Sequence, residues 1–232
     1  MSLSIEQQEQ IDLQLKEHNH NKYEVNIQLS DKEVLNGLIV HPNVLRPEIT
    51  TAQYLAKWLF ENKELYQNKV VIDIGSGTGI QGVITGLYGA RQVIFSDISE
   101  EAVKNTEENV TKFNLSKKAR ILTGDLFEKI NDKADLIIFN HPFFPEEPTK
   151  DNPILRAMVD SGDLIHRFFK DAKKFLNTNG KIIMPYFHMG GDINNPAIQA
   201  PKHDYTVVEK LRVTIAHGLT LQKGEVSIYE IQ

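Results

Sequence analysis

The 232-residue sequence has no cysteine, a single tryptophan and no long apolar run. The lack of cysteine excludes a disulfide framework, a thiolate metal site and a cysteine nucleophile. No apolar run approaches the roughly 20 residues that a membrane-spanning helix needs, and the N-terminus does not have the basic and apolar segments of a secretory signal. We therefore expect no membrane partner and, by default, a cytoplasmic location.

The sequence also has fewer basic than acidic residues: 26 lysine and arginine residues against 31 aspartate and glutamate residues, which gives a net charge of −5. Tight, non-specific binding to a long polyphosphate is not what this balance favours. The eight histidines are scattered, so we expect no metal site. The hydrophobic fraction of 41% is that of an ordinary globular protein, and the length suits one α/β domain with a small extension.

What the sequence does contain is organised around residues 70–79, VVIDIGSGTG. The β-branched residues of this stretch suit a strand that is buried on both faces of a parallel sheet. Gly75, Gly77 and Gly79 then permit positive φ angles and a close approach of the main chain to a ligand. A helix that begins at Ile80 would point its free N–H groups at the same ligand. The stretch therefore predicts a ligand-binding turn between a strand and a helix.

Three further strands are predicted after this turn, at residues 92–97, 119–122 and 134–139. The first ends in Asp97, roughly twenty residues beyond the glycines, where an acid accepts hydrogen bonds from ribose hydroxyls in nucleotide-binding sheets. The second ends near Asp125. The third leads directly into the tetrapeptide Asn140-His141-Pro142-Phe143. Because parallel strands end at one edge of a sheet, these polar residues are expected to meet there.

In this order, the segments IDIGSGTG, SD, GD and NHPF resemble the class I S-adenosylmethionine-dependent methyltransferases. They are similar to the methyltransferase small-domain group in particular, whose signature is Asn-Pro-Pro-Tyr/Phe. The resemblance covers roughly residues 36–232. It implies S-adenosyl-L-methionine as the cofactor and an α/β fold: a Rossmann-like, seven-stranded, mostly parallel sheet with helices on both faces. Two tail strands, Tyr205 to Ile215 and Leu221 to Ile231, would form its C-terminal antiparallel hairpin.

Residues 1–40 are expected to form an N-terminal extension, and residues 41–232 the methyltransferase domain. The polar segment 1–22 predicts a short helix, and the alternation from Tyr23 to Leu29, followed by Val34 to Val40, predicts a β-hairpin. This hairpin resembles the one that precedes the catalytic domain of release-factor glutamine methyltransferases. Those enzymes usually carry a larger helical N-terminal domain, for which this chain has too few residues. Near the other end of the chain, residues 145–153 predict a polar loop, and Asp160 to Leu176 an amphipathic helix.

The resemblance also assigns roles at the cofactor site. The three glycines would let the backbone lie against the methionine part and the ribose, while Asp73 would reach the ammonium group and Asp97 the ribose hydroxyls. Asp125 would accept a hydrogen bond from the adenine amine, and Leu126 would pack on the ring. The expected cofactor-binding residues are Asp73, Gly75, Gly77, Gly79, Asp97, Ile98, Asp125, Leu126 and Asn140.

The tetrapeptide carries the expected catalytic residues, Asn140, His141, Pro142 and Phe143. A planar amino group is a poor nucleophile because its lone pair is delocalised. The side-chain oxygen of Asn140 and the carbonyl oxygen of His141 would accept its two N–H bonds and stabilise the developing positive charge. Phe143 would stack on the flat acceptor. His141 replaces the usual proline of the signature, which keeps the carbonyl but adds an N–H group and a titratable ring.

Two other functions are compatible with the sequence. Residues 77–82 fit the G-x-G-x-x-G pattern, so an NAD(P)-dependent oxidoreductase is one alternative. A methyltransferase fold that binds the cofactor without catalysis is the other. The methyl acceptor is also open between a protein glutamine, a nucleobase and a small molecule, with the acidic charge leaning away from nucleic acid. The sequence is compatible with a monomer or a homodimer.

Overall fold

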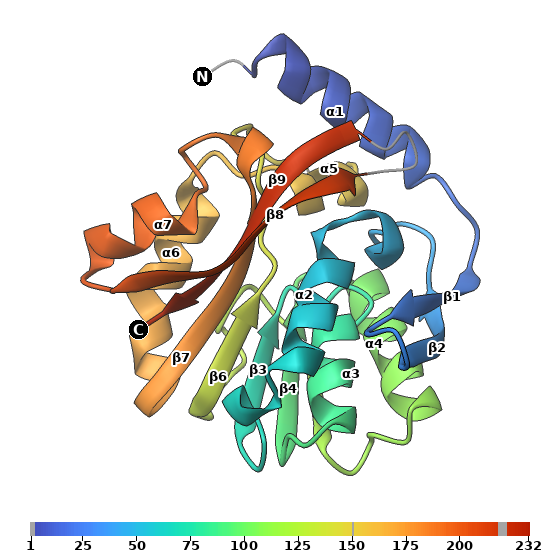
Figure 1. Cartoon of the computed structure of the whole chain (residues 1–232), viewed down its shortest axis with the longest axis vertical. Coiled ribbons are helices and arrows are strands. Elements are labelled where there is room, and N and C mark those ends of the chain that lie inside the picture. The colour runs from blue at the N-terminus through green and yellow to red at the C-terminus, as the bar shows by residue number, and fades with distance from the viewer. Residues whose placement is uncertain (1–2, 150, 218–221) are drawn as a thin grey trace.

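The computed structural model describes residues 3–149, 151–217 and 222–232. Its main sheet has seven strands, which are β3 (Val70–Ile74), β4 (Gln92–Asp97), β5 (Ala119–Thr123), β6 (Ala134–Phe139), β7 (Leu176–Phe187), β8 (Val207–His217) and β9 (Gln222–Ile231). They lie in the order β5-β4-β3-β6-β7-β9-β8 (Figure 1). The first five run parallel, whereas β9 is antiparallel to both β7 and β8. This arrangement confirms the predicted fold class.

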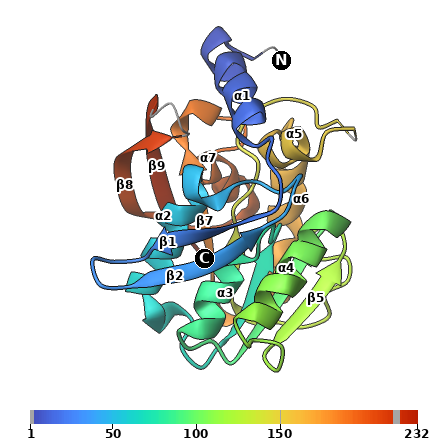
Figure 2. The ribbon, with the colours of Figure 1, turned by 90° about the vertical axis from the view of Figure 1, so that its right-hand side faces the viewer.

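Helices cover both faces of this sheet (Figures 1 and 2). The helices are α1 (Ile5–Glu17), α2 (Thr51–Glu61), α3 (Ile80–Leu87), α4 (Glu100–Lys112), α5 (Pro153–Met158), α6 (Asp163–Ala172) and α7 (Pro196–Gln199). Alternate residues of each strand enter different cores, as a period of two requires. Val71 and Ile138 pack with α2 and α3, whereas Ile72 and Ile137 pack with α6. The central strands are therefore buried on both faces.

Two segments differ from the sequence expectation. The helix predicted to reach Leu176 ends at Ala172, and β7 begins at Leu176, so that this strand is 12 residues long. In the segment predicted as a loop, Asn152 caps the short helix α5, because its side chain accepts a hydrogen bond from the Leu155 N–H. Leu221, the predicted start of the last strand, lies outside the described residues.

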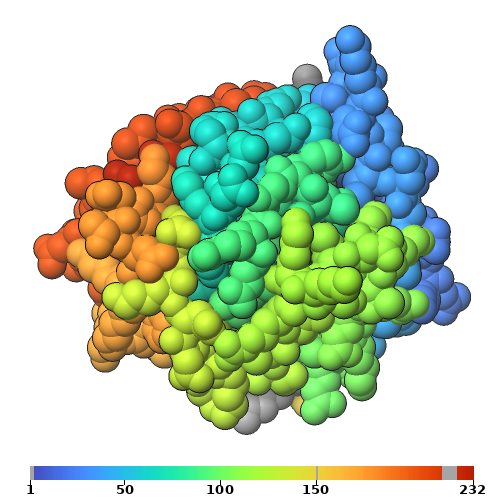
Figure 3. All heavy atoms as spheres, turned by 90° about the horizontal axis from the view of Figure 1, so that it is seen from below, coloured from blue at the N-terminus to red at the C-terminus, as the bar shows by residue number. Residues whose placement is uncertain are grey.

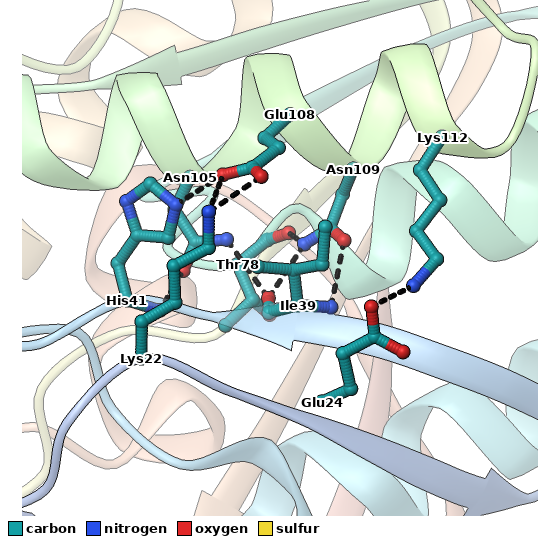
Figure 4. A network of polar contacts seen from close by, with 9 residues as sticks. All are labelled: Lys22, Glu24, Ile39, His41, Thr78, Asn105, Glu108, Asn109 and Lys112. Carbon is teal, nitrogen blue, oxygen red and sulfur yellow. Dashed lines mark hydrogen bonds and ion pairs between the residues drawn. The ribbon is translucent and has the colours of Figure 1, made fainter.

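A two-stranded hairpin, β1 (Tyr23–Gln28) and β2 (Val34–Val40), is fastened to α4. Asn109 of α4 accepts a hydrogen bond from the Ile39 N–H and donates to the Ile39 carbonyl, both at 2.8 Å. Its amide also donates to the carbonyl of Thr78, in the glycine-rich turn, at 2.8 Å (Figure 4). Lys22 and Lys112 form ion pairs with Glu108 and Glu24 across the same junction. One buried side chain thus ties the hairpin to the turn.

Helix α1 lies across the end of the molecule toward which β3 and β6 point (Figure 1). A capping box formed by Ser4 and Gln7 begins it, and Ile11 is buried against α5 residues and Phe144. Gln7 also donates a hydrogen bond to the Met189 carbonyl at 2.9 Å. The turn of the β1–β2 hairpin projects from one side of the molecule (Figures 2 and 3). None of the helices in the described part of the chain has the length and apolar composition needed to cross a membrane.

Candidate active site

A cavity of about 520 Å³ lies at the carboxyl ends of β3, β4, β5 and β6. The chain leaves β3 for β4 on one side, while β6 pairs with β3 on the other. Such a reversal of strand order opens the crevice in which doubly wound sheets bind ligands. The volume is that of a site for a small organic molecule.

The glycine-rich turn forms one wall of this cavity. Gly75, Gly77 and Gly79 have φ angles of 62°, 56° and 76°, the left-handed region that glycine adopts at little cost. Gly75 and Gly77 line the cavity. Gly79 instead lies against α4, because a Cβ there would meet the Thr106 side chain at 3.1 Å. The conformation of the turn is as expected, but Gly79 is explained by helix packing.

Asp97 ends β4 beside this turn. Its two carboxylate oxygens accept hydrogen bonds from the backbone N–H groups of Gly77 and Ser99, both at 2.9 Å. Burial raises the pKa of Asp97, although these N–H groups and the nearby Arg156 oppose the shift. A carboxylate has about four lone-pair positions, so it can also accept a hydrogen bond from a ligand hydroxyl. Asp97 therefore orders the turn and still faces the cavity.

Asp73 is the most deeply buried acid at the site, with 2% of its surface exposed. One of its oxygens accepts a hydrogen bond from the Gly82 N–H at 2.8 Å. Burial raises the pKa of Asp73 to about 8, and the negative charge of Asp97 adds to the effect. A cation bound at this carboxylate would reverse the shift. The site is therefore suited to a positively charged group.

Asp125 and Leu126 follow β5 at the far side of the cavity. The Asp125 carboxylate forms an ion pair with Arg167 of α6 at 2.7 Å. Leu126 has a φ of 49°, which is unusual for a side chain of this size, and its carbonyl accepts a hydrogen bond from the Ser96 hydroxyl. Ile98 nearby is 53% exposed. Exposed apolar surface next to a paired carboxylate suits a flat ring that carries an amine.

The tetrapeptide forms the wall after β6, and all four of its residues line the cavity. The Asn140 side-chain oxygen accepts a hydrogen bond from the Thr51 hydroxyl at 3.1 Å, which fixes the plane of the amide. Phe143 and Phe144 both donate their N–H groups to the Met158 carbonyl at 3.0 Å. Residues from α2 and α5 therefore set the orientation of the loop.

The His141 ring packs inward, behind the tetrapeptide, and is 2% exposed. Its Nε2 donates a hydrogen bond to the Asn194 carbonyl at 2.7 Å, and the ring stacks on Tyr186. Burial lowers the pKa of His141 to about 4, so the ring is neutral near pH 7. Asn194 donates in turn to the carbonyls of Asp160 and Phe143. The histidine thus replaces the rigidity of a proline with an anchor to a distant loop.

Three residues at or behind this site were not identified from the sequence: Arg156, Arg167 and Asn194. The pair Asn152-Pro153 is a helix-start signal that could have placed Arg156 at the cavity. Arg167 lies on the polar side of a helix that was predicted. Nothing local in the sequence marks Asn194, because its partners lie far along the chain.

The cavity is predominantly acidic. Of the described residues that line it, two are basic, Arg156 and Arg167, and six are acidic, namely Asp73, Asp97, Asp125, Glu147, Asp160 and Asp163. A bare phosphate backbone would be repelled by such a surface. Along the wall, a buried carboxylate, an acid at the end of β4 and an apolar patch follow one another. These residues fit a ligand with an amino end, a sugar and a flat ring, as in S-adenosylmethionine.

Comparison with known proteins identifies the family. Residues 50–189 match the methyltransferase small domain family. The chain is 30% identical over 183 residues to the release factor glutamine methyltransferase of Clostridium acetobutylicum, which covers 72% of this chain and 63% of that protein. It is 31% identical over 134 residues to the release factor glutamine methyltransferase of Borreliella burgdorferi, covering 52% and 46%. The chain thus spans less than two thirds of either relative.

Solved structures show the same fold at lower identity. The ribosomal protein L11 methylase of Lactobacillus delbrueckii subsp. bulgaricus superimposes with a TM-score of 0.61 at 17% identity, covering 89% of this chain and 97% of that one. This likeness concerns the architecture of the sheet and helices and carries no information on the acceptor.

Proposed function

The chain belongs to the methyltransferase small domain family and is an S-adenosylmethionine-dependent methyltransferase, and on that premise we propose that it methylates a planar nitrogen, the side-chain amide of a protein glutamine. The observation that carries the proposal is the placement of Asn140. Its amide lines the same cavity as the glycine-rich turn, and Thr51 fixes the plane of that amide. Membership of a methyltransferase family rules against the alternative function, an NAD(P)-dependent oxidoreductase.

The residues of this chain have a simple task in the reaction. S-adenosylmethionine, when bound, supplies a methyl group that its sulfonium has already activated. We propose that Asp73 holds the ammonium end, Asp97 the ribose hydroxyls, and Asp125 and Leu126 the adenine, while Gly75 and Gly77 admit the backbone close to the ligand. Holding two reactants in alignment can supply several kcal/mol of the barrier, about 7–11 in well-oriented cases.

Asn140 would act on the acceptor nitrogen. The Thr51 hydroxyl uses one lone pair of the Asn140 oxygen, so the second is free to accept an acceptor N–H. The His141 carbonyl would accept the other N–H, and these two bonds would stabilise positive charge as the nitrogen gains the methyl group. Phe143, held edge-on to Tyr186, would cover the flat amide. His141 itself is a poor base with a pKa of about 4, so we propose that the proton leaves the methylated nitrogen to water.

Two findings support a protein glutamine over a nucleobase. The related enzymes named above are release factor glutamine methyltransferases. Apart from Asp73, whose raised pKa keeps it mostly protonated near pH 7, the cavity has five acidic residues and two basic ones, which disfavours an acceptor that is embedded in a phosphate backbone. Glu147, in the loop after the tetrapeptide, is one of these acidic residues.

The proposal is tested by methylation with donor labelled in the methyl group. Acceptors are a set of peptides with one central glutamine and, separately, DNA and RNA oligonucleotides. We expect label in the peptides, released as methylamine on acid hydrolysis because the methyl group sits on an amide nitrogen. Label confined to oligonucleotides would overturn the glutamine assignment, and absence of turnover with every acceptor alongside normal donor binding would indicate a silent fold.

Two variants test the assigned residues in the same assay. Asn140→Ala should keep donor affinity within a few fold and lose most turnover, at least about 100-fold for a lost transition-state acceptor. Asp97→Ala should instead weaken donor binding. Asn36→Ala, an exposed asparagine on β2, is the matched control and should behave as wild type. Full turnover by Asn140→Ala would show that the proposed nitrogen clamp is wrong.

A further inference from the structure

Arg156, on α5, is a cation on the cavity wall that forms no ion pair with the described part of the chain. Its side chain is partly exposed and lines the cavity. Its backbone N–H donates a hydrogen bond to the Asn152 carbonyl at 3.0 Å. Among residues 3–149, 151–217 and 222–232, no group bonds to its guanidinium, and this includes the exposed Glu147 on the preceding loop. Five N–H donors are therefore available to a ligand.

Most of the other charged groups on the wall already have partners. Arg167 forms ion pairs with Asp125 and Asp163, both at 2.7 Å. The Asp160 carboxylate accepts two backbone N–H groups in the first turn of α6, at 3.0 and 3.1 Å. Arg156 is thus the basic residue of the cavity that can bind an anion without losing an ion pair.

Helix α5 holds this cation in a fixed position next to the tetrapeptide. Met158, two residues after Arg156, accepts the N–H groups of Phe143 and Phe144, both at 3.0 Å. Met158 also packs with Phe144 in the core that α5 shares with the neighbouring helix α1 (Figures 1 and 2). The guanidinium is therefore attached to the same loop that would hold the acceptor nitrogen.

The position of Arg156 along the cavity separates it from the amino-acid end of the donor. Burial raises the pKa of Asp97, and the positive charge of Arg156 opposes this shift, so the two side chains are near each other. The pKa of Asp73 responds to burial, the Gly82 N–H and Asp97, with no effect from Arg156. In the proposed binding mode Asp73 holds the amino-acid end, which carries the donor's one carboxylate. The ribose and adenine near Arg156 are uncharged, so the donor supplies no anion there.

We propose that Arg156 binds a carboxylate of the acceptor protein, an aspartate or glutamate side chain close in sequence to the methylated glutamine. This inference rests on the proposed function of the cavity and adds an acidic residue to the acceptor sequence. A guanidinium and a carboxylate can form two parallel hydrogen bonds, which fixes orientation as well as adding affinity. A single unpaired cation suits one carboxylate, whereas a phosphate backbone calls for several.

The test uses matched peptides with one central glutamine. Each peptide of one set has an aspartate within two residues of the glutamine, and its counterpart has asparagine at that position, which has nearly the same shape and no charge. With labelled donor, wild type should show a kcat/KM about tenfold higher for the best aspartate peptide than for its counterpart. Arg156→Gln should methylate the two equally. Arg156→Lys should keep part of the preference, because it retains the charge but not the planar fork.

Arg91→Gln is the matched control. Arg91 is exposed and precedes β4 at its amino end, whereas the cavity lies at the carboxyl end, so this variant should keep the wild-type preference. Calorimetry with S-adenosylhomocysteine should show that Arg156→Gln binds it within a few fold of wild type, which also confirms that the variant is folded.

Three results would overturn the inference, and each has a different meaning. If wild type methylates both peptides of every pair equally, or if Arg156→Gln keeps the preference, the acceptor carboxylate is wrong and the glutamine assignment stands. If Arg156→Gln loses S-adenosylhomocysteine binding and leaves the peptide preference unchanged, Arg156 belongs to the donor site. If wild type methylates oligonucleotides and none of the peptides, the proposed function is wrong and this inference falls with it.

Discussion

Replacing Asp73 with asparagine should stabilise the protein in a pH-dependent way. The pKa of this carboxyl is about 8 in the folded protein, against an ordinary value of 3.8. The folded state therefore binds a proton that the unfolded state releases. The stability due to this group is present at low pH and is lost as pH rises toward the folded pKa. Asparagine does not titrate and can still accept the Gly82 N–H, so the variant avoids this loss.

The size of the effect follows from the two pKa values. Between about pH 5 and pH 8 the unfolded carboxyl is ionised while the folded one remains mostly protonated, which costs the wild type about 4 kcal/mol. The free energy of unfolding of Asp73→Asn, minus that of wild type, should therefore rise by this amount across the range. The buried carboxyl of Asp160 also has a raised pKa, which both proteins share. The repulsion between Asp73 and Asp97 is part of the expected difference, because asparagine at position 73 removes it.

Urea unfolding at several pH values measures this difference. Thr85→Ala provides a non-titrating control in the adjacent helix, and its difference from wild type should stay constant with pH. If the curves of Asp73→Asn and wild type run parallel from pH 5 to pH 8, the carboxyl is not desolvated as the structure indicates. The same variant should bind S-adenosylhomocysteine more weakly, because asparagine has no negative charge to offer the ligand's ammonium group. A gain in stability with a loss of binding is the usual trade-off at a functional residue.

Two further predictions concern the walls of the cavity. His141→Pro recreates the usual signature but removes the hydrogen bond to Asn194 and the packing on Tyr186. We expect the free energy of unfolding, measured by thermal unfolding, to fall by about 2–4 kcal/mol. Donor affinity should stay within a few fold of wild type. An unchanged melting temperature would mean that the ring does not anchor the loop. Asn109→Ala removes three buried hydrogen bonds that join β2, α4 and the glycine-rich turn, and should cost about 3 kcal/mol in urea unfolding and weaken donor binding. Normal donor binding by a destabilised Asn109→Ala protein would show that the turn keeps its shape without this tie.

The sequence predicted the sheet well because each parallel strand is a short apolar run bounded by polar residues. Val70 to Ile74 and Ala134 to Phe139 are buried on both faces, so their composition carries the signal without any partner being known. The strand ends that bear Asp73, Asp97, Asp125 and Asn140 follow from the same runs. Their convergence on one cavity needed only the rule that parallel strands end at one edge.

The sequence predicted less where a residue's role depends on a distant partner. Gly79 belongs to the same motif as Gly75 and Gly77, yet its surroundings are set by Thr106 of α4. The β7 strand starts at Leu176 because that residue pairs with Ala134, a contact that no local pattern encodes. The helix α5 was missed for another reason, since six residues are too few to show a helical period.

The tetrapeptide illustrates why its four letters do not by themselves define an active site. Thr51, 89 residues away in sequence, holds the Asn140 oxygen, and Met158 accepts the two N–H groups that follow Pro142. Asn194, about 50 residues further on, binds the loop through both its side chain and its carbonyl. Because rates depend steeply on alignment, these supports must matter as much as the motif. A histidine can therefore stand where proline is usual, provided that a residue such as Asn194 restores the lost rigidity.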